Sequence, residues 1–144
     1  MIKKNIVIAS DHAGYILKEE IKQYLSDFCR VKDLGTSNST KSVDYPDYAQ
    51  QLAHFMLTDK EYIGILICGS GIGISIAANR YQHLRAALCH NTETATLARK
   101  HNDANVIVLG ARVTPESEVY KALDAFLSTK FEGGRHQIRV DKLS

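Results

Sequence analysis

Short apolar runs alternate with longer segments of mixed polarity along the whole chain. The apolar runs are rich in isoleucine, valine and leucine and end at polar residues or glycine, which is typical of buried strands. We expect strands at Asn5–Ser10, Arg30–Leu34, Tyr62–Cys68, Leu84–His90 and Asn105–Leu109. Because these runs are too continuously apolar to face water on one side, they favour a parallel sheet that is covered by helices.

The segments between the strands place apolar residues at helical spacing. In the first segment Ile21, Leu25 and Phe28 recur every three or four positions. Before the last segment, Thr114 can cap a helix and Pro115 suits the first helical position. We expect helices at Tyr15–Phe28, Tyr45–Asp59, Ile74–Tyr81, Thr92–Asn102 and Pro115–Thr129.

This alternation predicts one doubly wound, Rossmann-like α/β domain over residues 1–144, with a five-stranded parallel sheet. Sheets of this kind bind ligands at the carboxyl ends of their strands. The polar loop 35–44 and the tail 131–144 are each long enough to help form such a site. The tail lacks clear periodicity, so no helix is predicted in it.

Composition narrows the class of protein. Of the 144 residues 44% are hydrophobic and 24% are charged, and the net charge of +2 does not suggest general nucleic-acid or membrane affinity. No apolar run approaches the roughly 20 residues of a membrane span, and the apolar part of MIKKNIVIAS is too short for a signal peptide. We therefore expect a cytoplasmic protein. The three cysteines include no CxxC pair and predict neither a disulfide framework nor a zinc site.

The most informative segment is ILICGSGIGISIAANR, which begins at Ile65. An apolar strand ends there at Cys68, and glycines follow at positions 69, 71 and 73 before a helix-compatible stretch. Backbone N–H groups at such a turn favour an anion, and the same field stabilises a thiolate. We expect Cys68 to be an exposed, reactive thiol on the rim of this loop. The alternative is a small core residue, which is what we expect of Cys29 and Cys89.

Three common glycine-loop functions do not fit this segment. A dinucleotide-binding loop follows the first strand and has a further glycine where this chain has Ile74. A Walker loop needs a Gly-Lys-Ser/Thr sequence, and a cysteine phosphatase loop would close on arginine; neither is found. What remains is a loop for a small oxyanion beside a thiol. That pairing suits proton abstraction next to a carbonyl, with loop amides holding the enediolate.

Polar residues follow the other strands or stand late in the chain, and each also has a structural alternative. Asp11 could simply cap the following helix, and His101 in a last turn could simply complement the helix dipole. Paired arginines are often only a solvated surface, although arginine is also preferred for phosphate contacts. The candidates for ligand contact are Asp11, His12, Tyr45, His101, Asn102, Arg112, Arg135 and Arg139.

Taken in order, several segments together resemble the B-type ribose-5-phosphate isomerases, a family that also contains the subunits of galactose-6-phosphate isomerase. These segments are SDHAG, DYP, ICGSGIGISIAANR, RKHNDANV, GARV and EGGRHQIRV, and they span nearly the whole chain. The resemblance implies a three-layer α/β/α sandwich and a homodimer or dimer of dimers. It also implies that no metal and no organic cofactor is needed.

The resemblance further implies a role for each candidate residue. Cys68 matches the base that moves a proton between C1 and C2, and Ser70 matches a hydroxyl that assists at the enediolate. Because a cysteine stands at position 68 and Ile74 replaces a glutamate used in another branch, the chain falls in the cysteine branch. His101 matches the histidine that opens the furanose ring. The remaining matches are an anion hole at Gly69, Ser70, Gly71, Ile72 and Gly73, sugar-hydroxyl contacts at Asp11 and Asn102, and phosphate contacts at His12, Arg112, Arg135 and Arg139.

Three functions stay open at this point. The first is the interconversion of ribose 5-phosphate and ribulose 5-phosphate. The second is isomerisation of a hexose 6-phosphate, such as galactose or allose 6-phosphate, by the same mechanism. The third is a non-catalytic module that binds a sugar phosphate. The resemblance implies that some site residues come from the partner subunit, so a monomer is expected to be inactive.

Overall fold

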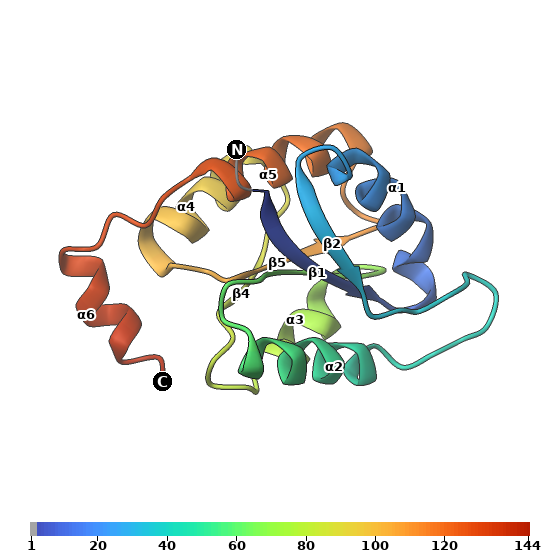
Figure 1. Cartoon of the computed structure of the whole chain (residues 1–144), viewed down its shortest axis with the longest axis horizontal. Helices are drawn as coiled ribbons and strands as arrows, with labels where there is room; N and C mark the ends of the chain where they lie inside the picture. Colours follow the sequence, from blue (N-terminus) through green and yellow to red (C-terminus); the bar gives the residue numbers. More distant parts are fainter. Residues whose placement is uncertain (1–2) are drawn as a thin grey trace.

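The computed structural model describes residues 3–144 and shows a single five-stranded sheet (Figure 1). Its strand order is β2-β1-β3-β5-β4, and every neighbouring pair is parallel. The strands are β1 (Lys4–Ser10), β2 (Cys29–Asp33), β3 (Ile63–Cys68), β4 (Ala86–Leu88) and β5 (Val106–Gly110). The order reverses beside β1 and β3, which confirms a doubly wound α/β fold and marks where such folds bind ligands.

Helices cover both faces of this sheet and complete the predicted three-layer sandwich (Figure 1). One apolar cluster packs α1, α4 and α5 on one face, and a second packs α2 and α3 on the other. Within residues 3–144 no helix is both long and apolar enough to cross a membrane. The helices are a short 3-10 turn η1 (His12–Gly14), α1 (Tyr15–Leu25), α2 (Tyr45–Thr58), α3 (Ile72–Ala78), α4 (Thr92–Asn102), α5 (Glu116–Ser128) and α6 (Arg135–Asp141).

The strands alternate their side chains between the two apolar clusters. In β3, Ile65 and Ile67 face α1, α4 and α5, whereas Leu66 and Cys68 face α2 and α3. All four side chains are buried. Burial on both faces explains why the strands read as continuous apolar runs. It also places the end of β3 next to the start of α3, where the glycine loop lies.

Two elements differ from their predicted bounds for local reasons. The helix α3 begins at Ile72, two residues before the predicted start, because Gly71 takes a positive φ of 80° and turns the chain at once. It ends at Ala78 because the Asn79 side chain bonds the backbone N–H and C=O of Ala86. The strand β4 is shorter than predicted, because the N–H of Arg85, the residue before β4, donates to Oδ1 of the Asn105 side chain.

The helix α1 ends at Leu25, three residues before its predicted end at Phe28. Further differences lie in the last third of the chain. Pro115, and not Thr114, is the cap residue of α5, because the Thr114 hydroxyl lies 3.3 Å from Nδ1 of His90. The tail contains the helix α6, which was not predicted. This helix has only seven residues and buries just His136 and Val140, so it leaves no apolar periodicity to recognise.

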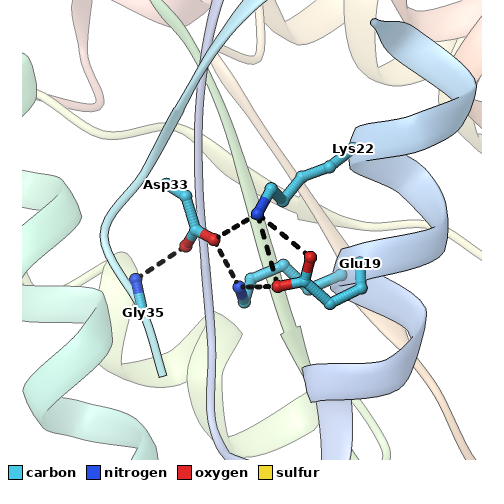
Figure 2. Close-up of polar contacts among 5 residues, drawn as sticks. Glu19, Lys22, Asp33 and Gly35 are labelled. Atoms are coloured by element: carbon cyan, nitrogen blue, oxygen red, sulfur yellow. Dashed lines mark hydrogen bonds and ion pairs between the residues drawn. The ribbon is translucent and has the colours of Figure 1, made fainter. Parts of the chain in front are cut away.

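A charged cluster between α1 and β2 holds the end of β2 in place (Figure 2). The Asp33 carboxylate accepts hydrogen bonds from Lys18 at 2.7 Å, Lys22 at 2.8 Å and the Gly35 N–H at 2.8 Å. Lys18 has no exposed side-chain surface, so its charge depends on these partners. Burial alone would raise the pKa of Asp33, but hydrogen bonds from Lys18, Lys22 and Gly35 outweigh it and hold that pKa below its ordinary value.

This cluster predicts a measurable loss of stability. Asp33→Asn leaves the Lys18 ammonium buried with a weaker partner, and should lower the free energy of unfolding by about 3 kcal/mol. Because the folded-state pKa of Asp33 is depressed, its contribution is present above about pH 4 and fades as the pH falls further. Urea unfolding of Asp33→Asn beside Asp27→Asn, which alters an exposed carboxylate, measures both effects. Equal stability of the two variants at pH 7 would contradict this role.

Candidate active site

The loop after β3 depends on close approaches that only glycine permits. A Cβ atom on Gly110 would lie 2.4 Å from the Ser70 carbonyl oxygen, so the end of β5 presses against this loop. A Cβ on Gly71 would lie 2.5 Å from Cδ1 of Leu88, and Gly71 also has a φ of 80°. The loop is therefore held tightly between β5 and β4, which fixes the directions of its amides.

Cys68 lies at the end of β3 inside this turn. Its Sγ accepts a hydrogen bond from the Gly71 N–H at 3.2 Å. Only 5% of the residue is exposed, so the expectation of an exposed thiol on the loop rim is wrong. The strand carries Cys68 into the cluster with α2 and α3, and only its sulfur edge reaches the loop amides. The loop therefore directs a backbone N–H at this sulfur.

Neither of the two other cysteines accepts a backbone N–H within residues 3–144. Burial raises the pKa of the Cys29 thiol, although Lys4 and Lys3 lower it in part. Burial also raises the pKa of the Cys89 thiol to about 11, against a small opposite effect of a hydrogen bond from Thr94. Both residues pack in the apolar cluster on the α1 face, as the sequence predicted for core cysteines. Cys68 is thus the cysteine whose surroundings suit an anion.

Ser70 and Arg112 border the same loop. The Ser70 hydroxyl accepts a hydrogen bond from the Ile72 N–H at 3.1 Å, and this keeps the hydroxyl on the loop. The Arg112 N–H donates to the Gly69 carbonyl at 2.8 Å, so the segment after β5 is tied to the segment after β3. The Arg112 side chain passes close to Gly69. A guanidinium and a hydroxyl therefore lie beside Cys68.

Asp11 and His12 follow β1, next to β3. Asp11 Oδ1 accepts the Gly14 N–H at 3.1 Å, so the capping alternative holds for this carboxylate. His12 Nδ1 accepts the Val43 N–H at 3.1 Å, which anchors the loop between β2 and α2. A ring nitrogen that accepts a backbone N–H carries no proton, so the proton of His12 is on Nε2. That nitrogen is then the donor available to an anion.

Tyr45 begins α2 and covers the start of α3. A Cβ atom on Gly73 would lie 2.6 Å from Cζ of Tyr45, so the ring rests directly on this glycine. The ring remains partly exposed. Part of the Tyr45 ring therefore only packs on α3, and the rest of the ring faces outward beside the loop. Asp11, His12, Tyr45, Arg112 and the loop 68–73 thus share the carboxyl edge of the sheet.

The remaining candidates lie at the opposite edge. The helix α4 starts after β4 and runs back, so His101 and Asn102 come just before β5 begins. The Arg85 Nε donates to the Asp103 carbonyl at 2.8 Å, which places this helix end beside the residue that precedes β4. Between the edges β3 pairs with β5 from Gly64 to Cys68, a rise of about 13 Å.

The arginines of the tail belong to this second group. The Glu132 N–H donates to the Lys100 carbonyl at 3.1 Å, so the tail joins the last turn of α4. The helix α6, with Arg135 and Arg139 exposed on it, then lies at one end of the molecule (Figure 1). The segment that joins β2 to α2 lies at the other end. One chain therefore does not bring Cys68 and His101 together.

Two residues beside His101 were not predicted. The ring of His136 stacks on the His101 ring with centroids 4.3 Å apart and planes 13° from parallel. Glu132 Oε1 lies 3.9 Å from His101 Nε2 and 3.5 Å from His136 Nε2. The only sequence signal was that His136 adjoins Arg135 in the tail. Recognising it required α6, whose seven residues show no pattern.

With both groups placed, comparison with known proteins gives a consistent result. The sequence model of the family described as Ribose/Galactose Isomerase matches residues 6–143. The chain is 44% identical over 142 residues to the ribose-5-phosphate isomerase B of Escherichia coli, covering 98% of this chain and 95% of that protein. A crystal structure of a Thermotoga maritima ribose 5-phosphate isomerase is 48% identical, with a TM-score of 0.93 and 96% of each chain covered.

One similar structure is described with a ligand. It is the ribose-5-phosphate isomerase B of Mycoplasma genitalium with bound ribulose-5-phosphate, and it is 45% identical to this chain. The TM-score is 0.92, with 96% of this chain and 93% of that chain covered. Sequence and backbone therefore agree over nearly the full length of both proteins.

The surroundings of the cysteines predict an order of alkylation. Iodoacetamide at about pH 8 should modify Cys68 before Cys89, because the pKa of Cys89 is raised to about 11 while Cys68 accepts a loop N–H. Peptide mass spectrometry at several times, with activity measured on the same samples, gives the order. Modification of Cys29 or Cys89 first, with activity intact, would contradict the assignment.

Proposed function

The chain belongs to the ribose/galactose isomerase family, and we propose that it interconverts D-ribose 5-phosphate and D-ribulose 5-phosphate. The observation that carries this proposal is the buried Cys68 sulfur, held under the amides of a rigid glycine loop at the carboxyl edge of the sheet. A base beside an anion hole suits a reaction that passes through an enediolate. The related structure with ribulose-5-phosphate supports a pentose phosphate as the substrate.

The proposed proton transfer uses Cys68 as the base. The thiolate removes the proton from C2 of the open-chain aldose, and the electron pair moves to the carbonyl oxygen, giving an enediolate. Cys68 then gives a proton to C1, a proton passes from the C2 hydroxyl to the C1 oxygen, and the carbonyl forms at C2, so no electron donor or acceptor is consumed. Loop amides and the Ser70 hydroxyl hold the oxyanion, and each such donor is typically worth about 3 kcal/mol.

The phosphate and hydroxyl contacts come from both edges of the sheet. We assign His12 and Arg112 to the phosphate on the Cys68 side, because His12 presents a protonated Nε2. Arg135 and Arg139 add cations from α6, and the planar guanidinium suits a phosphate. Asp11 and Asn102 are assigned to sugar hydroxyls, and Tyr45 to the sugar face. Binding of the remote phosphate supplies energy that the reacting centre can use.

A complete site then needs two copies of the chain. Cys68 and His101 lie at opposite edges of one sheet, so the His101 that opens the furanose ring must come from a second subunit. We therefore propose a homodimer, or a dimer of dimers, in which each site combines the two edges. We also place the enzyme in the cytoplasm, because all three cysteines are free and the mechanism needs a reduced thiol.

Two other functions remain as alternatives. The family description includes galactose, so an isomerase of hexose 6-phosphates with the same mechanism is the first alternative. A non-catalytic module that binds sugar phosphates is the second. The Gly71 N–H that is aimed at Cys68 favours an enzyme, because a binding module has no need of a thiolate. The two enzymes differ only in the sugar that they accept.

A substrate panel separates these functions. Ketose formation from ribose 5-phosphate should exceed that from galactose 6-phosphate and allose 6-phosphate at equal concentrations, with EDTA present. Cys68→Ala should lower turnover by about a thousandfold or more, as loss of a catalytic base does, while substrate binding survives. Cys29→Ala, in the core at the far end of β2, is the matched control. Turnover of a hexose phosphate alone, or full activity of Cys68→Ala, would contradict the proposal.

Mixing two inactive variants tests the shared site. Cys68→Ala and His101→Ala chains should each be inactive as homodimers. After denaturation and refolding together at equal amounts, about half of the dimers are mixed, and each mixed dimer contains one intact site. The mixture should therefore regain about a quarter of the unmodified activity, as random pairing in a two-fold dimer requires. No recovery in a mixture shown by native mass spectrometry to contain mixed dimers would place both residues in one chain's site.

A further inference from the structure

His101 is held by neighbours that have no assigned part in the reaction. Its side chain is 40% exposed, and on an open surface such a ring would rotate freely. Instead the His136 ring lies flat against it, with centroids 4.3 Å apart and planes 13° from parallel. The two rings come from separate elements, α4 and α6, so their contact also joins the tail to the body.

His136 is buried and incompletely bonded. Its side chain is only 9% exposed, and its Nε2 has no hydrogen-bond partner among the described residues. Burial lowers the pKa of His136, and the neighbouring His101, Arg135 and Arg139 lower it further, while Glu132 opposes them. The lowered pKa favours the neutral form of the His136 ring, on whose face the His101 ring packs.

Glu132 completes the arrangement with a fixed negative charge. Its backbone N–H donates to the Lys100 carbonyl at 3.1 Å, so it is anchored to the last turn of α4. Its Oε1 lies 3.9 Å from His101 Nε2 and 3.5 Å from His136 Nε2, so one carboxylate faces both rings. Glu132 therefore holds both stacked rings next to the last turn of α4.

We propose that His136, together with Glu132, is a positioning residue that sets the ring plane of His101 for opening the furanose. This inference rests on the proposed function. Opening the ring breaks the bond between C1 and the ring oxygen: a proton leaves the C1 hydroxyl, and another is added to the ring oxygen. An imidazole serves both transfers only when its nitrogens point at these oxygens.

The same three side chains are poorly arranged for a metal ion. A bound ion lies in the plane of each ligating imidazole, about 2.1 Å from its nitrogen. Two stacked planes only 13° from parallel do not meet within that distance, although the three ligand atoms lie within 4.8 Å of one another. Binding an ion through both histidines would break the stack. The arrangement therefore suits the orientation of His101 better than metal binding.

Three variants separate the parts played by His136. His136→Ala removes the ring, His136→Phe keeps a ring that can stack but has no nitrogen, and Gln137→Ala alters an exposed neighbour on α6 as a control. Two reactions are measured for each. One is ketose formation from ribose 5-phosphate, which requires ring opening. The other is exchange of the C1 proton of ribulose 5-phosphate in D2O by NMR, which starts from an open chain and needs Cys68, its loop and the binding contacts but no ring opening.

The proposal predicts that the two reactions respond differently. His136→Ala should lower kcat for ribose 5-phosphate about tenfold or more, with KM within about twofold, because misorientation costs rate more than affinity. His136→Phe should recover most of the kcat. His101→Ala should lose ring-dependent turnover altogether. In both His136 variants, and in Gln137→Ala, the C1 proton exchange should stay within about twofold of the unmodified protein.

Each other outcome overturns a specific claim. Unchanged kcat in His136→Ala overturns the positioning role, as does an equal loss of turnover and proton exchange, which would mean that the whole site or the tail had changed. If His136→Phe is as slow as His136→Ala while Gln137→Ala is normal, the stack is not what matters. If the unmodified protein catalyses neither reaction, the proposed function itself is wrong, and the inference falls with it.

Discussion

The direction of the chain in a parallel sheet constrains everything else in this molecule. Each strand ends at the same edge, and each connecting helix returns the chain to the opposite edge. Residues that follow strands, such as Cys68 and Arg112, therefore gather at one edge, while residues that close helices, such as His101, gather at the other. Side-chain movement within one chain cannot bring residues from these two opposite edges together. The proposed site residues of one chain therefore lie at two opposite edges, and the proposed homodimer brings the two groups together through a second copy.

At the edge that carries Cys68, close backbone packing fixes the glycine loop and the direction of its amides. The contact of Gly110 with the Ser70 carbonyl and the positive φ of Gly71 leave the loop no alternative path. A fixed loop aims its amides before any substrate arrives, so no reorganisation is needed when negative charge develops. The Asp33 cluster likewise fixes the neighbouring turn, because the Asp33 carboxylate holds the Gly35 N–H at the end of β2.

The sequence predicts the sheet, its covering helices and the loop because each leaves a local pattern. Apolar runs marked the five strands, and the glycines after Cys68 marked the turn. The exposure of Cys68 could not be predicted, since it depends on how α2 and α3 pack over β3. The helix α6 and the stack of His136 on His101 were not predicted, because a helix of seven residues with two buried side chains shows no apolar periodicity in the sequence. The separation of Cys68 from His101 became visible only with the topology.

The most direct test of the shared site is a crystal structure of the Cys68→Ala protein soaked with ribulose 5-phosphate. The account predicts one ligand at each loop 69–73, with its oxygens on the loop amides and the Ser70 hydroxyl of one subunit. His101, Arg135 and Arg139 around the same ligand should belong to another subunit. A ligand whose contacts all come from one chain, or one bound away from the loop, would contradict the account.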